Sequence, residues 1–142
     1  MLDQLDMDIV QRLRKNARIP YLDIARDLKV SESTIRNRVA GLERKGVIKG
    51  YDLKIDPAKL GYNSVAYVGV DVQPERFLDV ATKLTEYDNV RMVATTSGDH
   101  MIMAEIWGER QAELRNFISE RIEKMTGVTR TCPAIVTETL KE

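Results

Sequence analysis

The chain has 142 residues, enough for one ordinary domain or two small ones. Hydrophobic residues make up 43% and charged residues 31%, which is typical of a globular protein and excludes a low-complexity chain. No apolar run reaches the roughly 20 residues of a membrane-spanning helix, and the acidic, polar start does not have the pattern of a signal peptide. We therefore expect a cytoplasmic protein with no membrane partner.

The formal net charge is zero, from 22 basic and 22 acidic side chains, but the charge is divided unevenly. Residues 1–56 hold 12 Lys and Arg against 9 Asp and Glu, so this part is positive and the remainder is negative. A nucleic acid partner requires positive charge at the surface that meets it. The division therefore supports a nucleic acid partner for the first part of the chain.

A first helix is predicted over about residues 6–16. Leu5, Ile9, Val10 and Leu13 recur there at helical spacing. Asp6 is expected to serve as its cap or as an acid in its first turn. This helix would cover the core of the two helices that follow.

Residues 23–45 have the pattern of a helix-turn-helix. A short apolar helix contains Ala25, which is small where two helices must cross, and a tight turn follows at Lys29 and the valine after it. Ser31 is a good N-cap for the second helix, because its hydroxyl can accept from free backbone N–H groups. That helix has one apolar stripe, made by Ile35, Val39 and Leu42. Lys29 stands where such a turn often has glycine, which predicts strain in the turn.

The side chains away from this stripe are alcohols, an amide and guanidinium groups. Asn pairs with adenine, Arg with guanine or phosphate, and Ser or Thr with either. We predict that this second helix enters the DNA major groove and that the residues in contact with DNA are Ser31, Ser33, Thr34, Arg36, Asn37, Arg38 and Arg44. The alternative is an ordinary helical hairpin with a solvated face, which carries the same residue types.

Gly46 is expected to end the second helix. Residues 47–55 alternate between polar and apolar side chains, which favours an extended strand and makes the unit a winged helix-turn-helix. Asp56-Pro57 and Leu60-Gly61 indicate a connector. We therefore predict a DNA-binding domain with its connecting strand over residues 1–60 and a second domain over residues 61–142.

The second domain is predicted to have four strands and two helices. The strands cover residues 64–72, 90–96, 101–107 and 128–136, one helix opens at Pro74, and the other covers residues 111–125. The order βαββαβ is the ferredoxin-like arrangement, with both helices on one face of an antiparallel sheet. The fold class of the whole chain is therefore α+β.

The predicted strands are apolar on both faces, although helices would cover only one. Val65 and Tyr67 alternate with Ala66, Val68 and Val70, and Met101, Met103 and Trp107 alternate with Ile102, Ala104 and Ile106. An exposed apolar sheet face indicates a protein interface, so we expect a homodimer built sheet to sheet. Such a dimer carries two recognition helices, which suits a pseudo-palindromic site on double-stranded DNA.

Motifs along most of the chain resemble the Lrp/AsnC family of feast/famine transcription regulators, and its archaeal members in particular. The matching residues are Leu5-Asp6, Ile9, Leu13, Ala17-Arg18, Ile24-Ala25, Leu28, Val30-Ser31, Arg38-Val39, Leu42-Glu43, Gly46, Ile48, Tyr51, Pro57, Leu60-Gly61 and Ser97-Gly98-Asp99. The resemblance implies a DNA-binding regulator that dimerises through its second domain, and in many members dimers assemble into octamers.

The resemblance also implies an amino-acid effector site near residues 96–101. The candidate residues are Thr96, Ser97, Gly98, Asp99 and His100. Gly98 would permit a close backbone approach, and Asp99 could accept from an α-amino group. Many relatives have a second carboxylate where this chain has Met101. The alternative is a β-turn that uses Gly-Asp for its geometry.

An enzymatic function is not favoured by the residues present. His100 is the only histidine and Cys132 the only cysteine, so no multi-His or multi-Cys metal site and no His-paired nucleophile is expected within one subunit. No P-loop or Rossmann glycine motif is present, and no cofactor is expected. Some tetrapyrrole decarboxylases resemble this family in fold, and an amino-acid-sensing partner protein is a third reading. The polar side chains of the second helix favour the DNA-binding regulator.

Overall fold

A computed structural model describes residues 1–142 as two compact units, Met1–Lys54 and Ile55–Glu142. The division falls slightly before the predicted boundary, because a short 3-10 helix, η1 (Pro57–Leu60), belongs to the second unit. No helix combines the length and apolar character needed to cross a lipid bilayer.

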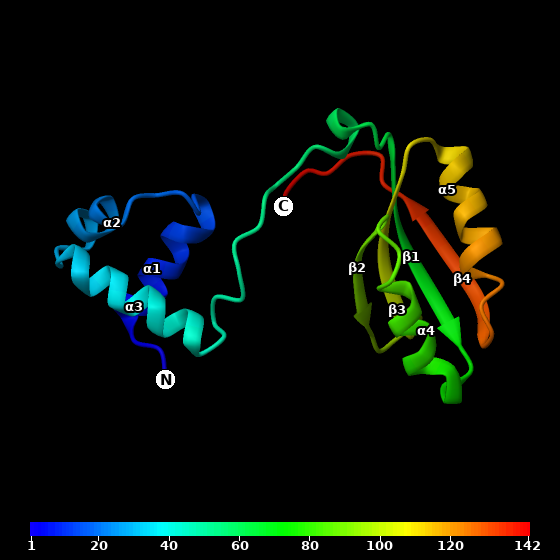
Figure 1. Ribbon diagram of the computed structural model, residues 1–142, viewed down its shortest axis with the longest axis horizontal. Helices are drawn as coiled ribbons and strands as arrows, with labels where there is room; N and C mark the ends of the chain where they lie inside the picture. Colours follow the sequence, from blue (N-terminus) through cyan, green and yellow to red (C-terminus); the bar gives the residue numbers. More distant parts are fainter. The chain divides into compact units, whose positions relative to one another are not determined.

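The N-terminal unit contains α1 (Gln4–Lys15), α2 (Tyr21–Leu28) and α3 (Glu32–Arg44) (Figure 1). Its core is built from one apolar side of each helix: Ile9, Leu13, Ile24, Ala25, Ile35, Val39 and Leu42 are all buried. Burial of each large aliphatic side chain contributes about 1.5–3 kcal/mol. The apolar stripe predicted for residues 35, 39 and 42 is confirmed.

The turn between α2 and α3 has a left-handed backbone at Lys29, with φ 57° and ψ 45°. Lys29 is the one residue other than glycine with a positive φ. The next amide, that of Val30, donates to the Ala25 carbonyl at 3.0 Å, which closes the end of α2. The expected strain is therefore present at this lysine.

Helix α1 begins earlier than predicted, because its cap is Asp3 and not Asp6. The Asp3 carboxylate accepts from the Asp6 amide at 2.9 Å, and the Asp6 carboxylate accepts from the Asp3 amide at 3.3 Å. This reciprocal pair is a capping box. Asp6 was expected to be either the cap or an acid of the first turn, and the structure confirms the second role.

The strand and wing predicted over residues 47–55 are not formed. These residues are a turn followed by irregular backbone, and the amides of Val47 and Ile48 both donate to the Leu42 carbonyl, at 2.9 and 3.2 Å. A strand needs a neighbouring strand to take up its backbone N–H and C=O groups. The N-terminal unit has no second extended segment, so it is a three-helix unit.

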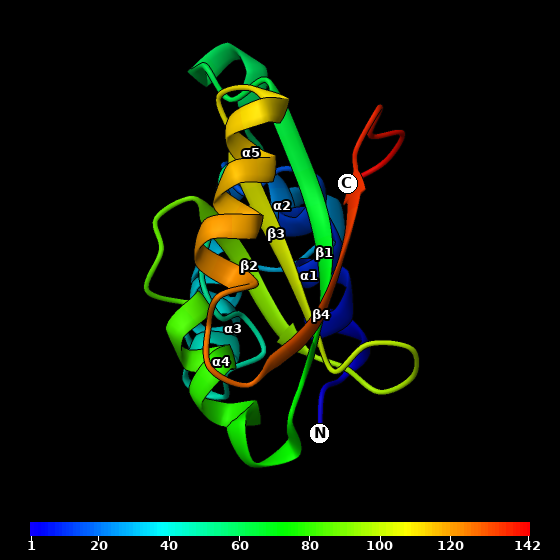
Figure 2. The ribbon, with the colours of Figure 1, turned by 90° about the vertical axis from the view of Figure 1, so that its right-hand side faces the viewer.

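The C-terminal unit has a four-stranded antiparallel sheet in the order β2-β3-β1-β4. The strands are β1 (Ser64–Val72), β2 (Val90–Thr95), β3 (Ile102–Gly108) and β4 (Val128–Ile135). A 3-10 turn, η2 (Pro74–Arg76), precedes α4 (Phe77–Leu84), and α5 (Gln111–Phe117) continues as a π-helix, η3 (Ile118–Ile122). Both helices lie on one face of the sheet (Figures 1 and 2), which confirms the βαββαβ arrangement.

The core of the C-terminal unit lies between the helices and one sheet face. Every second residue of β1 and β3 points into it, and the buried set is Ala66, Val68, Val70, Val72, Val80, Leu84, Ile102, Ala104, Ile106, Leu114, Ile118 and Ile122. Tyr67 pairs with Glu105 and Gly69 with Met103 on the opposite face. Met101 was grouped with Met103 and Trp107 on one strand face, but it packs against the core, because it precedes β3 and escapes the alternation of the strand.

Candidate DNA-binding surface and effector loop

The N-terminus of α3 is held by three hydroxyl groups. The Ser31 hydroxyl accepts from the Thr34 amide at 3.1 Å, which satisfies a free N–H group of the first turn. The same oxygen lies 3.0 Å from Ser33 Oγ and 2.8 Å from Thr34 Oγ1. Ser31 and Ser33 are exposed, so their hydroxyls stay at the surface while they fix the start of the helix.

Farther along the exposed side of α3, the side chains of Asn37 and Arg44 have no hydrogen bond or ion pair within the chain. Both are exposed, whereas Ala40 between them is half-buried. The opposite side of the helix is locked into the core. The amide of Asn37 and the guanidinium of Arg44 thus lie on a helix face that the core holds in place, and neither has an intramolecular partner.

Arg36 is exposed but is not free of contacts. Its guanidinium forms an ion pair with Glu32 one turn earlier and lies over the Tyr21 ring, 5.5 Å from the ring centroid. The aromatic contact ties this side chain to the start of α2. Arg36 therefore lies on the flank of α3 near α2.

Arg38 was predicted to contact DNA, but the structure places its guanidinium against the start of α1. Its Nη1 is 2.5 Å from Asp3 Oδ2 and 3.2 Å from Asp6 Oδ1. The hydrogen bonds that the guanidinium donates to these carboxylates raise the pKa of Arg38. The pKa of Asp3 is lowered, first by the Asp6 amide and then by Arg38. Arg38 thus joins α3 to α1, a role that local spacing could not reveal.

The predicted effector loop is closed at its base. The Thr96 amide donates to the Met101 carbonyl at 2.9 Å, and the Thr96 hydroxyl donates to the His100 carbonyl at 2.6 Å. At the tip, Gly98 has φ +115° and open space where a side chain would be. Asp99 is exposed and has no side-chain partner in the chain.

His100 does not join the other loop residues at the tip. Its ring lies against Gly69 of β1, where an added Cβ would stand 2.5 Å from the imidazole. Its Nδ1 lies 3.3 Å from Asp71 Oδ2. Sequence reasoning missed Gly69 and Asp71. The available signal was a glycine inside a β-branched strand, which marks a close approach by another group.

The sheet face that the helices leave open carries large apolar side chains. Tyr67 is 42% exposed and Met92 37% exposed. Trp107 is covered from within the unit, because the Tyr62 ring lies 5.4 Å away and the Arg91 guanidinium 4.6 Å above it. Its indole N–H donates to Glu105 at 3.0 Å. This surface, called the open face below, combines exposed apolar groups with ordered polar ones.

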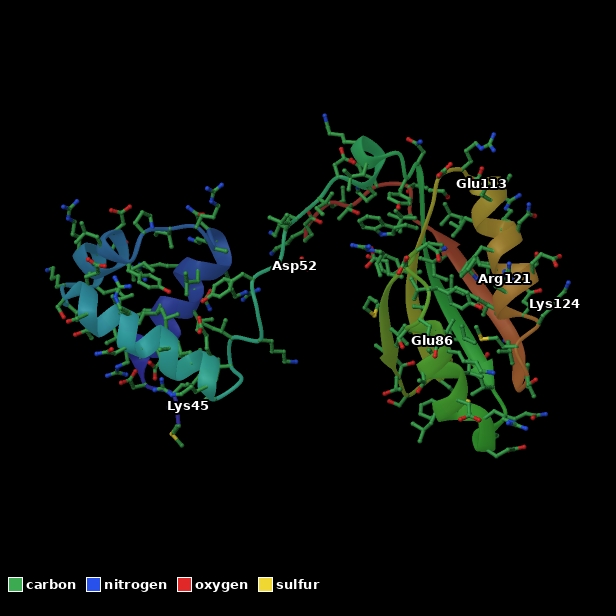
Figure 3. All side chains as sticks on the ribbon, in the orientation of Figure 1. Lys45, Asp52, Glu86, Glu113, Arg121 and Lys124 are labelled. Atoms are coloured by element: carbon green, nitrogen blue, oxygen red, sulfur yellow. The ribbon has the colours of Figure 1, made fainter.

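A groove of about 390 Å³ lies on the helical side of the C-terminal unit. Its lining comes from the end of α4, from η3 and from the residues that directly follow each of them: Lys83, Glu86, Tyr87, Glu120, Arg121, Lys124 and Met125. Figure 3 shows Glu86, Arg121 and Lys124 among these side chains. Lys124 pairs with Glu120 at 2.5 Å and lowers the pKa of that carboxyl. No group of three or more His, Cys, Asp or Glu side chains is placed to hold a metal ion.

Sequence comparison matches both units to known domains. Residues 2–43 match the AsnC-type helix-turn-helix domain, and residues 65–142 match the Lrp/AsnC ligand binding domain. The HTH-type transcriptional regulator LrpA of Pyrococcus horikoshii is 48% identical over 99% of this chain and 100% of its own length. The regulator LrpA1 of Halobacterium salinarum is 38% identical over 94% of each chain.

Solved structures with the same fold cover the whole chain. AsnC of Escherichia coli superposes with a TM-score of 0.88 at 25% identity, over 100% of this chain and 96% of its own. A transcriptional regulator of Neisseria meningitidis, solved as a complex with L-Met, superposes with a TM-score of 0.91 at 19% identity, over 100% of this chain and 94% of its own. With two matching domains and relatives named as regulators and not as enzymes, the chain belongs to the Lrp/AsnC family of transcriptional regulators.

Proposed function

We propose that the chain binds pseudo-palindromic promoter DNA as a homodimer, with α3 of each copy in the major groove. Asn37 and Ser33 read base edges, and Arg44 contacts a phosphate. The observation that carries this proposal is the exposed side of α3, where Asn37 and Arg44 lack partners while the other side is fixed in the core. Because the proposed partner is chromosomal DNA, the proposed location of the protein is the cytoplasm.

The test is selection of duplexes from a random library, followed by gel-shift titration. We expect the parent protein to enrich sites with two related half-sites. Asn37→Ala should relax the preference at one base pair by roughly 1–3 kcal/mol. Asn116→Ala is the matched control, because Asn116 is an exposed amide on α5. Failure of the parent to enrich any sequence would contradict the proposal.

The homodimer is proposed to form through the open face. Tyr67 and Met92 supply exposed apolar surface on two different strands, and such a patch marks a protein contact. The dimer brings two copies of α3 to one DNA molecule, which matches the symmetry of a pseudo-palindrome. Association of dimers into octamers, as the family resemblance implies, is part of the same proposal.

Light scattering of Tyr67→Lys tests this contact. A lysine at residue 67 would place a charge in any sheet-to-sheet interface, so the mass should fall to that of a monomer. Leu78→Lys is the control, because Leu78 is 74% exposed on α4, on the helical side. Equal masses for Tyr67→Lys and the parent, with both folded, would exclude this face. The mass of the parent also reports on octamer formation.

An amino acid is the proposed effector, bound at residues 96–99. Membership in a family with a ligand-binding domain supports it, together with the open space at Gly98 and the partnerless carboxylate of Asp99. The carboxylate suits an α-ammonium group. The other reading, a turn that uses Gly-Asp for geometry, is supported by the two hydrogen bonds that close the loop.

Calorimetry with each of the twenty amino acids separates these two readings. If the loop is a sensor, at least one amino acid should bind and shift DNA affinity or oligomer mass, since a ligand acts by binding two states unequally. Asp99→Asn should abolish that response and leave effector-free DNA binding unchanged. If none of the twenty binds the parent, the loop is a structural turn.

A further inference from the structure

Glu32 and Arg36 form an ion pair at the surface of α3, one helical turn apart. The Glu32 side chain is 43% exposed and that of Arg36 62% exposed, and Nη2 of the arginine donates to a carboxylate oxygen. Residues four apart lie on the same face of a helix. An exposed pair of this kind contributes little to folding stability. Its carboxylate, however, lies in the first turn of the helix that is proposed to read DNA.

Tyr21 supplies a second contact for the same guanidinium. The central carbon of the Arg36 guanidinium lies over the Tyr21 ring, 5.5 Å from the ring centroid, and Tyr21 packs against the core of the N-terminal unit. Glu32 thus holds one nitrogen of the guanidinium, while the group as a whole lies over a ring that the core keeps in place. A planar group with two such contacts has little freedom to turn.

Arg36 is a neighbour of the residues proposed to read bases. Around the helix axis it lies about 60° from Ser33 and about 100° from Asn37. A guanidinium has five N–H donors, so after the bond to Glu32 enough remain for the O6 and N7 acceptors of a guanine in the major groove. A carboxylate this close to DNA is repelled by phosphates, which favours keeping Glu32 paired with Arg36 in the complex.

We propose that Glu32 is a positioning residue that holds Arg36 for the recognition of a guanine and keeps it away from the phosphate backbone. This inference rests on the proposed function, because it needs α3 in the major groove. An arginine that contacts a phosphate adds affinity without sequence information, whereas one that donates two hydrogen bonds to guanine adds discrimination. Glu32 thus lowers non-specific affinity and raises specificity at one base pair.

The experiment compares base preference and salt dependence for the full chain and its Glu32→Ala and Arg36→Ala variants. Gel-shift titrations use duplexes changed at one position of the enriched half-site, and the base pair whose guanine preference Arg36→Ala loses is the one that Arg36 reads. We expect Glu32→Ala to reduce that preference at least about fivefold, the lower end for a bidentate contact. The salt slope for unrelated DNA should become steeper by about 1, because the released Arg36 then reaches a phosphate.

The double variant, Glu32→Ala with Arg36→Ala, tests whether Glu32 acts through Arg36. Its base preferences should equal those of Arg36→Ala alone. A further loss of preference in the double variant would show that Glu32 reads a base itself. An unchanged guanine preference in Glu32→Ala would show that the ion pair does not set specificity. Either result overturns the inference, and so does an Arg36→Ala variant that keeps every guanine preference of the parent.

Two controls separate positioning from folding, because an acid in the first turn also stabilises a helix through its dipole. The preference at the base pair read by Asn37 should be the same in Glu32→Ala and in the parent, and loss of both preferences would show a disturbed helix and overturn the inference. Glu120→Ala is the matched control, because it removes an exposed pair with Lys124 at the same spacing in the C-terminal unit. A parent that enriches no sequence overturns the proposed function itself.

Discussion

The imidazole of His100 occupies the space that a side chain on Gly69 would need, and Asp71 holds it there at 3.3 Å. Gly69 lies in the middle of β1, between β3 and β4 in the sheet. The base of the proposed effector loop is thereby packed onto the open face. Because the His100 ring fills the space beside Gly69, the effect of a substitution at one of these residues should depend on the other.

Gly69→Ala is expected to destabilise the C-terminal unit by about 1–3 kcal/mol, because the new methyl group displaces the His100 ring. In a His100→Ala background that obstacle is gone, and the same change should shift the free energy of unfolding by less than about 0.5 kcal/mol. Denaturant unfolding of the two single variants and the double variant measures the coupling. Equal effects of Gly69→Ala in both backgrounds would show that the ring does not stay there in solution.

Arg38 and Arg44 lie six residues apart on α3, yet we expect different losses from their removal. Arg44→Ala should weaken binding to all DNA sequences alike, lower the salt slope by about 1 and leave the melting temperature unchanged. Arg38→Ala should lower the melting temperature, because the nearly buried Asp6 carboxylate loses its cation. Thermal unfolding and gel shifts at several salt concentrations distinguish the two. Arg115→Ala, an exposed arginine of α5, is the control.

Asp3→Asn tests the pH dependence of the contact between α1 and α3. Hydrogen bonds lower the pKa of Asp3 below 3.8, so its charge contributes stability above that value and the contribution is lost as pH falls through the lowered pKa. Asparagine still caps a helix. The variant should therefore unfold more easily than the parent at pH 7, with a smaller difference at pH 2. A difference independent of pH would contradict a role for the charge.

Lys29→Gly is expected to stabilise the N-terminal unit by about 0.5–1 kcal/mol, because glycine adopts the left-handed conformation without a Cβ clash. Lys45 follows α3 with φ −77° and ψ −6°, so Lys45→Gly removes the same side chain without relieving any strain (Figure 3). That control should be neutral or destabilising by about 0.5 kcal/mol. Calorimetric melting of both variants gives the comparison, and a lower melting temperature for Lys29→Gly would contradict the expected strain.

Periodicity predicted what depends on neighbours along the chain. The stripe of Ile35, Val39 and Leu42 and the buried side of β1 follow from the repeats of a helix and a strand. The alternation over residues 47–55 led to the wrong prediction of a strand, because periodicity describes only neighbours along the chain. It describes a segment that could pair, but it does not supply the second strand that pairing needs.

Periodicity could not predict contacts between residues that are distant in the sequence. Arg38 looked like other arginines of α3, since its partners lie 32 and 35 residues away at the start of α1. His100 was grouped with the loop because it is next to Asp99 in sequence. Its position on Gly69 depends on how the loop folds back over β1, which no local pattern specifies.

The contact of Arg38 with Asp3 has a practical consequence for how the protein is handled. Any peptide joined ahead of Met1, such as a purification tag, would begin two residues from a carboxylate that is bonded to the proposed DNA-reading helix. It could alter DNA affinity without touching DNA. A fusion after Glu142 instead joins the other unit, far along the chain from the residues that make the contact between α1 and α3.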